Sequence, residues 1–485
     1  MMIGIDFGTT NSSVAIYRAT GAEMIETVDN LDLMPSAVAQ LDNGHYLTGQ
    51  PALLQMRRNP EFTFRNIKRF VGRDYDEQEH GHFQLAEGED GKVWWRGRTG
   101  LISGPTLVAE IFKSILLAAE YRLGRKPMGA VVAVPVDFRE PQRAAIIEAA
   151  RMAGLKKVEL FEEPYCAALA FGIERQKFSR VAVYDLGGGT FDITILRMKG
   201  GNTKALGMSG TAQVGGADFD QRLADHAMDR FFEAEGEDLR ANPLQMVGIL
   251  RAAEDAKKTL SRLETATVAD ENVAFPKSGL ASLDVPVTRA EFEDMTMDLV
   301  TRTIASVQDA LAQAEMKAAD IDHVLLVGGQ SRMPLIRGVL EDLFGSKKIE
   351  RAGPKPELAV ALGAAIRAAE LDGRIKPAVM QRLIPASIGI RVAGGAYYAF
   401  IKKGETSPIR RERVLRAAHE GQAELELVVL EGEEPMAADN TEVCRIIIPV
   451  APHDRPPIML DIDRSGHLQV WAAGQIIYGQ SEEAA

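Results

Sequence analysis

Two stretches of the chain share one pattern of hydrophobic and polar positions. Each has an apolar run that ends in Asp, a turn rich in Gly and Thr, and a second apolar run that returns to polar residues. They span Ile3 to Arg18 and Val181 to Met198. Apolar runs separated by a short Gly-containing turn are typical of β-hairpins. Because a recurring pattern indicates an internal duplication, we predict two related halves that face each other across a cleft.

Around these hairpins, strands alternate with long helices up to about residue 373. Thr106 to Gly124 has apolar residues at helical spacing and ends at Gly. Ala130 to Val136 is a short apolar run typical of a buried strand. It leads into a second predicted helix, with Pro141 in its first turn and Gly154 at its C-terminal cap. The alternation predicts an α/β fold in which helices cover β-sheets.

The pattern changes after residue 373. Residues 374–387 contain prolines, arginines and a lysine, and we interpret them as an interdomain linker. Beyond them, Ala423 to Leu430 and Ile458 to Ala473 alternate with a period of two, which is typical of strands with one buried face. We predict that residues 388–485 form a small antiparallel β-sandwich with no helical lid after it.

Composition narrows the class of protein. The 485 residues carry a net charge of −12, which disfavours binding to nucleic acid or to anionic membranes. No stretch approaches the roughly 20 apolar residues that a membrane span needs. The two cysteines, Cys166 and Cys444, cannot form a disulfide framework, which favours a reducing compartment. We expect a cytoplasmic protein that binds neither nucleic acid nor membrane.

The turns of the two hairpins carry groups that can hold a chain of phosphates. Glycines allow close approach of the backbone, its amides can point at phosphate oxygens, and Thr hydroxyls add donors. A carboxylate at the end of the strand can hold a hydrated Mg²⁺. One such turn alone could be a plain β-turn, but two copies at matching places favour a clamp around a nucleotide tail and its metal. The residues are Asp6, Gly8, Thr9 and Thr10 in the first hairpin, and Asp185, Gly187, Gly188, Gly189, Thr190 and Asp192 in the second.

Two further segments could contribute to a nucleotide site. A predicted buried strand from His323 leads into Gly328 and Gly329 and then to Arg332, where a base or ribose could lie on the backbone; a simple strand-to-helix turn is the alternative. A predicted helix around residues 249–263 carries Glu254, Lys257, Lys258 and Ser261 on one polar stripe. These form either a solvated face with an i,i+4 ion pair or a set of donors and acceptors for adenosine. Its buried stripe is predicted to contain Ile249, Ala253, Ala256, Leu260 and Leu263.

Seven segments resemble, in order, the motifs of the 70-kDa heat-shock chaperone family, the DnaK-like proteins. They are GIDFGTTNS, FRNIKRFVGR, FEEPYCAALAFG, VYDLGGGTFD, VGGADFD, AEDAKKTLS and LVGGQSRMP. The resemblance implies an actin-like ATPase fold of two duplicated RNase H-like halves over residues 1–373, a linker over 374–387 and a peptide-binding-like β-sandwich over 388–485. The implied cofactors are ATP or ADP and Mg²⁺, and the two hairpins would be the two phosphate loops.

The resemblance also implies a role for each matching residue. Asp6 and Asp185 would position hydrated Mg²⁺ against the phosphates, while Lys68 would reach the γ-phosphate and help to place the attacking water. Glu163, Thr190 and Asp192 would belong to the network of metal and water around the nucleophile. The residues that would cradle the phosphates are Gly8, Thr9, Thr10, Asn11 and Gly187 to Thr190. Those that would hold ribose and adenine are Gly215, Gly216, Glu254, Lys257, Lys258, Ser261, Gly328, Gly329 and Arg332.

By the same resemblance, the β-sandwich would bind extended apolar segments of unfolded or partly folded client proteins, with backbone hydrogen bonds giving affinity and a small pocket giving selectivity. Pro135 and Arg143 match positions that relay the nucleotide state toward the linker; for Arg143 the alternative is an ordinary charge on a helix surface. The residues placed around the peptide pocket are Ile388, Ile390, Leu415, Leu425 and Leu427, and for any one of them the alternative is a core residue of a small sandwich.

Three departures from the family pattern limit these implications. Arg382 stands where the linker usually has Asp, and Glu159 stands where a basic residue is usual, so we predict a charge-swapped pair if the two positions meet. Because the family uses these positions to bind J-domain cochaperones, the swap argues against a standard J-domain cochaperone. The resemblance also implies a nucleotide exchange factor as a partner. The missing lid predicts fast peptide exchange. Ala393 and Ala418 are small where the family has residues that arch over the peptide, which predicts a less enclosed cleft.

Three functions fit these features. The first is an ATP-driven chaperone whose nucleotide state controls client binding. The second is a nucleotide-switched regulatory or scaffold protein with one dedicated partner and slow or uncoupled ATP turnover. The third is a small-molecule kinase on the same fold, which would leave the β-sandwich unexplained.

Overall fold

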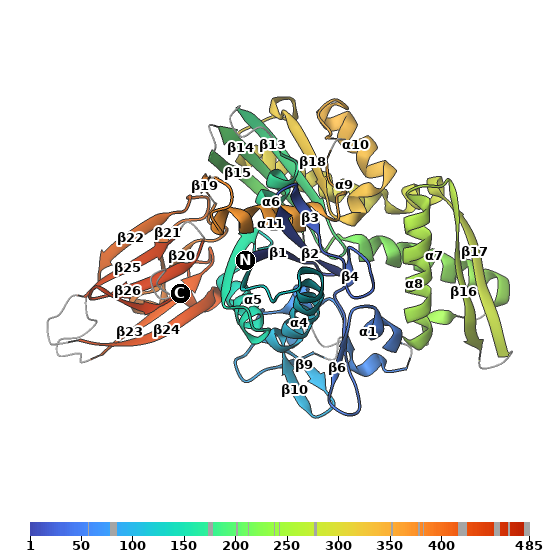
Figure 1. The fold of residues 1–485 in the computed structure, drawn as a ribbon, viewed down its shortest axis with the longest axis horizontal. Coiled ribbons are helices and arrows are strands. Elements are labelled where there is room, and N and C mark those ends of the chain that lie inside the picture. The colour runs from blue at the N-terminus through green and yellow to red at the C-terminus, as the bar shows by residue number, and fades with distance from the viewer. Residues whose placement is uncertain are drawn as a thin grey trace.

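The protein is described by a computed structural model that covers residues 1–56, 58–77, 85–172, 178–199, 202–211, 213–236, 238–241, 243–275, 279–350, 353–376, 379–381, 383–415, 424–450, 456–463 and 466–479. Figure 1 shows two mixed β-sheets near the centre with helices around and between them, and a pair of smaller sheets at one end of the molecule. Within the described ranges, no helix is both long enough and apolar enough to cross a membrane.

The first central sheet has the strand order β12-β11-β1-β2-β3. β1 runs parallel to β11 and antiparallel to β2. All of β11 is buried, and so is all of β1 except Asp6, which explains the unbroken apolar runs of these strands in the sequence. The strands are β1 (Met2–Phe7), β2 (Asn11–Arg18), β3 (Gly21–Met24), β11 (Gly129–Val134) and β12 (Lys157–Glu162), and the short β4 (Met34–Pro35) pairs with β2.

The second central sheet has the order β18-β13-β14-β15-β19. β13 runs antiparallel to β14 and parallel to β18, so its pairing repeats that of β1 with β2 and β11. The two predicted hairpins are therefore β1–β2 and β13–β14, at the same place in each sheet. The strands are β13 (Ser179–Leu186), β14 (Phe191–Lys199), β15 (Asn202–Thr211), β18 (His323–Val327) and β19 (Val379–Gln381).

Two Ala-rich helices, α6 (Glu163–Ala170) and α11 (Ala359–Leu371), lie between the two sheets. One buried cluster joins Val131 of the first sheet, Val183 of the second, Ala167 of α6 and Ala364 of α11. The packing is close enough that a Cβ on Gly363 would collide with the backbone of Cys166. Another on Gly4 of β1 would collide with the backbone of Ala365 of α11.

Two helices, α4 (Gly104–Leu123) and α5 (Glu140–Met152), pack against the first sheet on its outer face. α4 begins after Ser103, whose hydroxyl accepts a hydrogen bond from the N–H of Thr106, and it ends at Gly124 with a φ of 67°. This is the predicted helix with its Gly cap. α5 packs against α4 and has Pro141 in its first turn, as predicted.

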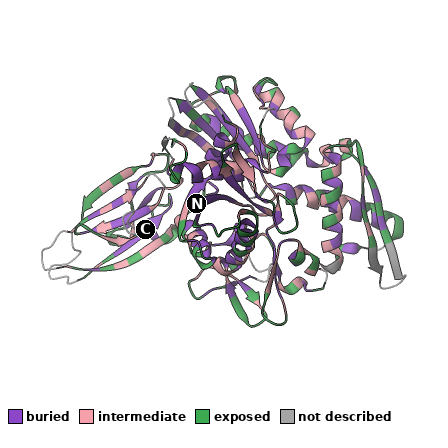
Figure 2. Cartoon of the chain, viewed as in Figure 1, coloured by how far each residue is buried: buried purple, intermediate pink, exposed green. Residues whose placement is uncertain are grey.

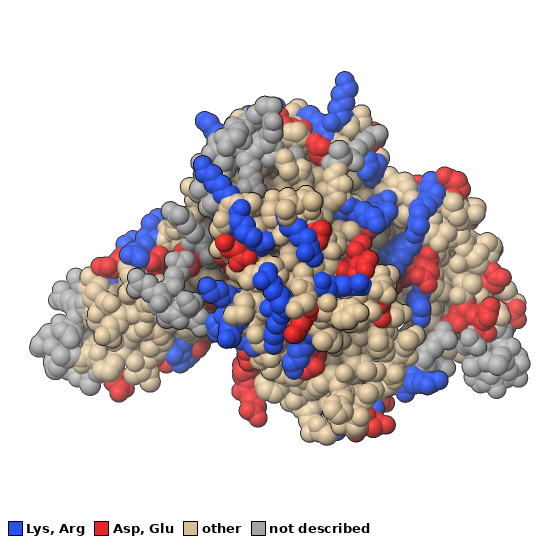
Figure 3. Space-filling model, viewed as in Figure 1, with Lys and Arg blue, Asp and Glu red and all other residues tan. Residues whose placement is uncertain are grey.

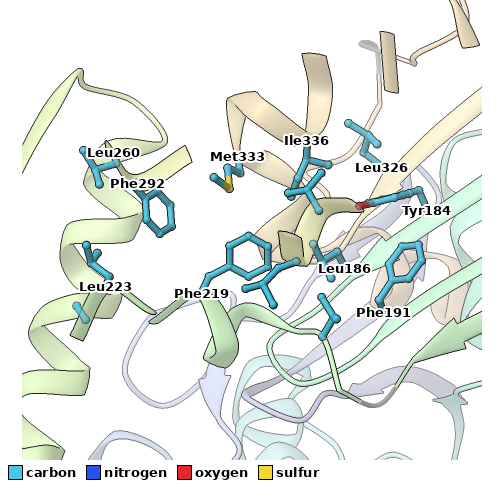
Figure 4. Packing of buried hydrophobic residues seen from close by; sticks show 14 of the residues in the cluster. Tyr184, Leu186, Phe191, Phe219, Leu223, Leu260, Phe292, Leu326, Met333 and Ile336 are labelled. Carbon is cyan, nitrogen blue, oxygen red and sulfur yellow. The ribbon is translucent and has the colours of Figure 1, made fainter. Parts of the chain in front are cut away.

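The largest buried cluster lies around the second sheet. In Figure 4, Tyr184 and Phe191 of this sheet lie on one side of the cluster, and Phe219 of α7 and Phe292 of α9 lie toward the other. The rings of Phe219 and Phe292 meet edge to face at 6.4 Å. Figure 2 shows that buried residues concentrate in the central strands and the helix faces turned toward them. The helices here are α7 (Gly216–Glu235), α8 (Pro243–Leu260), α9 (Arg289–Gln313) and α10 (Pro334–Phe344).

Most of the predicted buried stripe of α8 is confirmed. Ile249, Ala253, Ala256 and Leu260 are buried, but Leu263 is 59% exposed because the helix ends before it. The remaining elements form two smaller lobes beside the central sheets (Figure 1). They are β5 (Val38–Gln40), β6 (Tyr46–Thr48), α1 (Gln50–Gln55), β7 (Thr63–Phe64), α2 (Ile67–Phe70), β8 (Leu85–Glu87), β9 (Val93–Gly97), β10 (Gly100–Ser103), β16 (Thr265–Phe275) and β17 (Gly279–Thr288).

The C-terminal part consists of two four-stranded antiparallel sheets, β21-β20-β23-β24 and β22-β25-β26-β27. One buried cluster contains residues of both, including Ile390 and Leu427 of the first and Leu460 and Val470 of the second. After β19, the described residues contain 3₁₀ turns but no α-helix. The strands are β20 (Ile388–Arg391), β21 (Tyr397–Ile401), β22 (Ile409–Val414), β23 (Glu424–Glu431), β24 (Thr441–Pro449), β25 (Pro457–Ile462), β26 (Leu468–Ala472) and β27 (Gln475–Tyr478).

Part of the segment interpreted as a linker is a strand. β19 lies within residues 374–387 and pairs in parallel with β15, from Asn202 opposite Val379 to Lys204 opposite Gln381. The edge of β15 offers backbone donors and acceptors, and a short extended segment can pair with such an edge whatever its side chains are. The connection to the β-sandwich is therefore fixed to the second sheet.

Gly363→Ala should lower the midpoint of urea unfolding, because the added Cβ would push α11 away from α6. Overpacking of this kind typically costs about 1–3 kcal/mol. Gly338→Ala is the matched control, since Gly338 lies in α10 where a Cβ meets no atom within 4 Å. There Ala should stabilise the protein by about 0.5–1 kcal/mol through its higher helix propensity. Equal shifts for the two variants would contradict the packing argument.

Candidate functional site

The Gly- and Thr-rich turns of the two hairpins face each other. A Cβ on Gly188 would collide with the hydroxyl of Thr10, and one on Gly189 would lie 2.9 Å from Cγ2 of Thr9. Glycine is needed because a side chain at either position would push the two turns apart. The sequence-predicted turn residues of both halves therefore line one narrow space.

The second turn is also held from behind by the start of α7. The N–H of Gly216 donates to the carbonyl of Gly187 at 2.9 Å, and that of Ala217 donates to the carbonyl of Gly188 at 2.8 Å. A Cβ on Gly215 would collide with the backbone of Gly189. Gly215 and Gly216 thus support the second phosphate-loop candidate directly.

A buried ion pair lies beside the two turns. Nζ of Lys68, on α2, lies 2.6 Å from Oε1 of Glu163, the first residue of α6, and both residues are buried. Burial by itself lowers the pKa of Lys68, but the carboxylates of Glu163, Asp6 and Asp185 outweigh it, and the pKa is raised. Lys68 is therefore a cation in an acidic setting, 95 residues away in sequence from its partner.

Three further carboxylates share this setting. Burial raises the pKa of Asp6 to about 7, with Lys68 lowering it and Glu163 raising it. Burial also raises the pKa values of Asp185 and Asp192, and repulsion from neighbouring carboxylates, Glu163 among them, raises both further. One lysine does not balance these carboxylates, so a bound cation would relieve the repulsion.

The donor set fits a hydrated Mg²⁺. Mg²⁺ usually keeps several waters and is held by one or two carboxylates together with phosphate oxygens. Among the described residues, no group of three His, Cys, Asp or Glu side chains could enclose a metal ion by itself. Asp6 and Asp185 can supply such an incomplete shell, with the remaining ligands coming from water and phosphate.

Two cavities adjoin these residues. One of about 10 Å³ is lined by Glu163, Asp185 and Asp192, which is the space of roughly one water. The other, of about 960 Å³, begins at Lys68 and Asp192 and extends to the β-sandwich. The hairpin residues that line its inner end also include Thr9 and Thr190.

The predicted adenosine residues form a second group around α8. Nζ of Lys257, which is buried, donates to the carbonyl of Gly216 at 2.8 Å and lies 2.8 Å from Oδ1 of Asp220. Lys258 pairs with Glu254 at 2.7 Å, which is the i,i+4 ion pair that the sequence left open as one alternative. Burial raises the pKa of Glu254, but the two lysines and a nearby arginine outweigh it and the pKa is lowered.

Other members of this group lie on neighbouring elements. Ser261, just after α8, donates to the carbonyl of Lys257 at 3.3 Å. Gly328, with a φ of 79°, precedes the 3₁₀ segment Gly329–Arg332, and Arg332 pairs with Glu357 at 2.6 Å. A Cβ on Gly329 would meet no atom within 4 Å, so the backbone there is open to a ligand.

The family assignment rests on a comparison over the whole chain. The sequence model of the family described as Hsp70 protein matches residues 2–484. The chain belongs to the Hsp70 family. Hsp70 proteins are ATP-dependent chaperones with an actin-like ATPase fold; they bind ATP or ADP with Mg²⁺ and interact with client proteins and cochaperones. The resemblance stated from the seven sequence motifs is confirmed.

In this Hsp70 protein, the predicted coupling residues have defined partners. Arg143 is buried, pairs with Glu162 at 3.0 Å and donates to the carbonyl of Phe138, so it is not an ordinary surface charge. Pro135 lines both cavities. Glu159 pairs with Arg367 of α11 at 2.8 Å, a partner that the sequence argument did not foresee. Arg382 lies outside the described residues, so its predicted pairing with Glu159 stays a prediction.

The contact between α5 and the β-sandwich was missed by sequence reasoning. Nη1 of Arg139 donates to the hydroxyl of Thr441 at 2.6 Å, and the N–H of Glu140 donates to Oε2 of Glu431 at 3.2 Å. Burial raises the pKa of Glu140 to about 7 and also raises that of Glu431. On the face in Figure 3, Lys and Arg side chains gather across the middle of the molecule, beside the sandwich, with Asp and Glu among them.

The structure places three of the five predicted peptide-pocket residues in the core of the sandwich. Ile388, Ile390 and Leu427 are buried, and Leu415 and Leu425 are half-buried against the same cluster. A place in the core is the alternative to a peptide pocket that the sequence left open for each of these residues. Of the two small arch residues, Ala393 lies in a 3₁₀ turn, and Ala418 lies outside the described residues.

Three other residues of the site were also missed. Asp137 lines the larger cavity, and burial and Glu163 raise its pKa although Arg73 and Lys68 oppose them. Gln330 is buried near Gly216. The charge of Arg65, in the opposite lobe, lowers the pKa of Glu254. Sequence reasoning could have found Asp137, because it lies two residues after Pro135 in a segment that was already singled out.

Asp6→Asn should stabilise the protein without nucleotide and Mg²⁺ at pH 8 and have little effect at pH 4. Because the pKa of Asp6 is about 7 when folded and 3.8 is its usual value, the folded state holds a proton that the unfolded chain releases between these values. Stability is therefore lost as the pH rises from about 4 through about 7. An amide avoids this loss, which is on the order of a few kcal/mol.

Urea unfolding midpoints at both pH values measure this effect. Asp42→Asn is the control, because the side chain of Asp42 is 90% exposed and should shift neither midpoint appreciably. A gain from Asp6→Asn that is the same at pH 4 and pH 8 would show that the buried charge is not its cause.

Proposed function

We propose that this Hsp70 protein hydrolyses ATP slowly and that its nucleotide state controls the binding of extended apolar segments of client proteins. The observation that carries the proposal is the pair of Gly- and Thr-rich turns facing each other beside the Lys68–Glu163 ion pair and three carboxylates. Residues 1–373 would be the nucleotide-binding domain, 374–387 the linker and 388–485 the peptide-binding domain.

The pairing of strands supports a duplicated ATPase domain. In each central sheet, a hairpin with a phosphate-loop turn lies beside a parallel strand, and the two turns approach at the line between the sheets. A cleft between two such halves can bind a phosphate chain from both sides. We infer two RNase H-like halves of an actin-like fold, with the nucleotide between them.

The phosphates would lie between the turns. Backbone N–H groups around Gly8 and Gly187 to Gly189, with the hydroxyls of Thr9, Thr10 and Thr190 and the amide of Asn11, would donate to phosphate oxygens. Asp6 and Asp185 would hold hydrated Mg²⁺, which when bound neutralises charge on the phosphates. Lys68 would donate to the γ-phosphate while Glu163 keeps its ammonium in place.

The attacking water would lie near the small cavity between Glu163, Asp185 and Asp192. Thr190 and Asp192 would orient it in line with the phosphorus, and a carboxylate that lines this cavity would accept its proton. Because the chain mainly positions the reactants and balances charge, hydrolysis should be slow.

The nucleoside would lie between α8 and the Gly328–Arg332 segment. Glu254, Lys257, Lys258 and Ser261 offer donors and acceptors there, and the exposed backbone at Gly329 offers a flat surface for base or ribose. Lys258 and Arg332, which are now paired with carboxylates at the surface, would exchange those partners for the ligand at little cost. Gly215 and Gly216 would contact the ribose.

The β-sandwich would be the part that binds clients. Strand β19 and the contacts of Arg139 and Glu140 with Thr441 and Glu431 connect it to the ATPase domain, which supports control of one by the other. Two cysteines that form no disulfide support a cytoplasmic location. J-domain cochaperones and nucleotide exchange factors are the regulatory partners that the family offers.

Lys68→Ala should slow single-turnover ATP hydrolysis by roughly 100-fold or more, because it removes a charged donor from the γ-phosphate and leaves Glu163 buried without its partner. The wild type should be stimulated by a short apolar peptide, and the variant should not. Rapid quenching of reactions with radiolabelled ATP, with and without the peptide, measures both effects.

Lys113→Ala is the matched control, because Lys113 makes an exposed i,i+3 pair with Glu110 on α4. It should hydrolyse ATP like the wild type. Wild-type hydrolysis that ignores the peptide would instead support the nucleotide-switched regulator with a dedicated partner. Full activity of Lys68→Ala would overturn the assignment of the site.

A further inference from the structure

The larger cavity joins the candidate phosphate site to the β-sandwich. Its volume is about 960 Å³, and its walls come from three parts of the chain. The inner wall contains Thr9, Lys68, Thr190 and Asp192, which are the residues assigned to the γ-phosphate and the attacking water. The far wall is formed by residues 431–434 and 439–441, around the β23–β24 connection of the sandwich.

Charges are unevenly distributed along these walls. The segment around α2 contributes three cationic residues, Lys68, Arg69 and Arg73, and the acidic Asp74. Asp137 and Asp192 add two further carboxylates at this end. The sandwich contributes one cationic residue, Lys403, and four acidic residues, Glu431, Glu433, Glu434 and Asp439. Arg139 of α5 adds a second cation at the rim, where carboxylates still predominate. An anion that enters from the inner end therefore passes from walls whose charges balance to a rim with an excess of carboxylates.

The sandwich is held over this opening by named contacts. Arg139 bonds to Thr441, and the backbone of Glu140 bonds to Glu431, so the acidic rim is fixed to α5. Glu433 is also fixed, because its carboxylate accepts hydrogen bonds from the N–H and the hydroxyl of Ser387. Glu434 and Asp439 are exposed, and within the described chain no hydrogen bond or ion pair holds their carboxylates.

We propose that inorganic phosphate leaves the site through this cavity and that the acidic rim of the docked sandwich slows its exit. This proposal rests on the proposed ATPase function. Hydrolysis produces ADP and phosphate, and the nucleoside part of ADP would fill the other side of the cleft, between α8 and the Gly328–Arg332 segment. The free phosphate lies at the end of the cleft from which the cavity starts. Phosphate is an anion, so carboxylates at the rim raise the barrier to its passage.

This arrangement makes product release depend on the sandwich. When the sandwich is docked, phosphate stays near Lys68, Arg69 and Arg73. When the contacts at Arg139 and Glu140 break, the rim moves away and the cavity opens to solvent. Docking of the sandwich would then set how long the protein remains in the state with both products bound.

The double variant Glu434→Gln with Asp439→Asn tests the proposal on the full-length chain. It removes two charges from the rim and leaves the docking contacts and the residues of the nucleotide site unchanged. Single-turnover reactions are followed in parallel by acid quenching, which measures hydrolysis, and by a fluorescent phosphate sensor, which measures release. Glu412→Gln is the matched control, since Glu412 is an exposed carboxylate of β22 that does not line the cavity.

In the wild type, release should lag behind hydrolysis. In the double variant, release should be roughly three- to tenfold faster at low ionic strength with hydrolysis unchanged, and added salt should reduce the difference. The control should behave like the wild type. Unchanged release in the double variant, or wild-type release that keeps pace with hydrolysis, would overturn the exit route while leaving the ATPase intact. Absence of hydrolysis in the wild type would overturn the proposed function itself, and the exit route with it.

Discussion

The ion pair between Lys68 and Glu163 is the interaction on which the rest of the site depends. It brings α2 of the outer lobe to the start of α6, between the two sheets, at a point where Asp6 and Asp185 also converge. Burying a lysine and a carboxylate is costly, and it becomes favourable only where geometry and surrounding charge are right. Here the extra carboxylates keep the lysine charged, and the lysine allows the carboxylates to lie close together.

The close approach of the two hairpins beside these charges explains why their turns are built from Gly and Thr. The two hairpins must approach until the backbone of one meets side chains of the other, and a Cβ at Gly188 would prevent this. Without a metal and phosphates, the carboxylates repel one another, and this repulsion lowers the stability of the folded protein. The same arrangement of charge therefore raises the affinity for a metal and phosphates and lowers the stability of the protein without them.

Much of this could be read from the sequence, since hairpins, helix caps and period-two strands are local patterns. The helix from Gly104 to Leu123, the turn residues and the i,i+4 pair of Lys258 were foreseen for that reason. The pairing of β19 with β15, the partner of Glu159 and the docking of Thr441 on Arg139 were not, because they join residues far apart in the chain that follow no periodicity. The family resemblance placed Ile388 and Ile390 around a peptide pocket, but a match of motifs could not distinguish a groove from a core.

The backbone-close packing of α11 against β1 and α6 has a mechanical consequence. Where Gly4 and Gly363 let main chains touch, there are no long side chains that could rearrange to accommodate sliding. This packing disfavours sliding of the two sheets past each other, so we infer that they move by rotation about an axis near these helices. A rotation of a few degrees moves atoms in proportion to their distance from that axis, so the displacement is smallest at the carboxylate cluster and largest at the tips of the flanking lobes. Under the proposed function, the cleft would then widen for nucleotide exchange while the carboxylates at its floor remain nearly still.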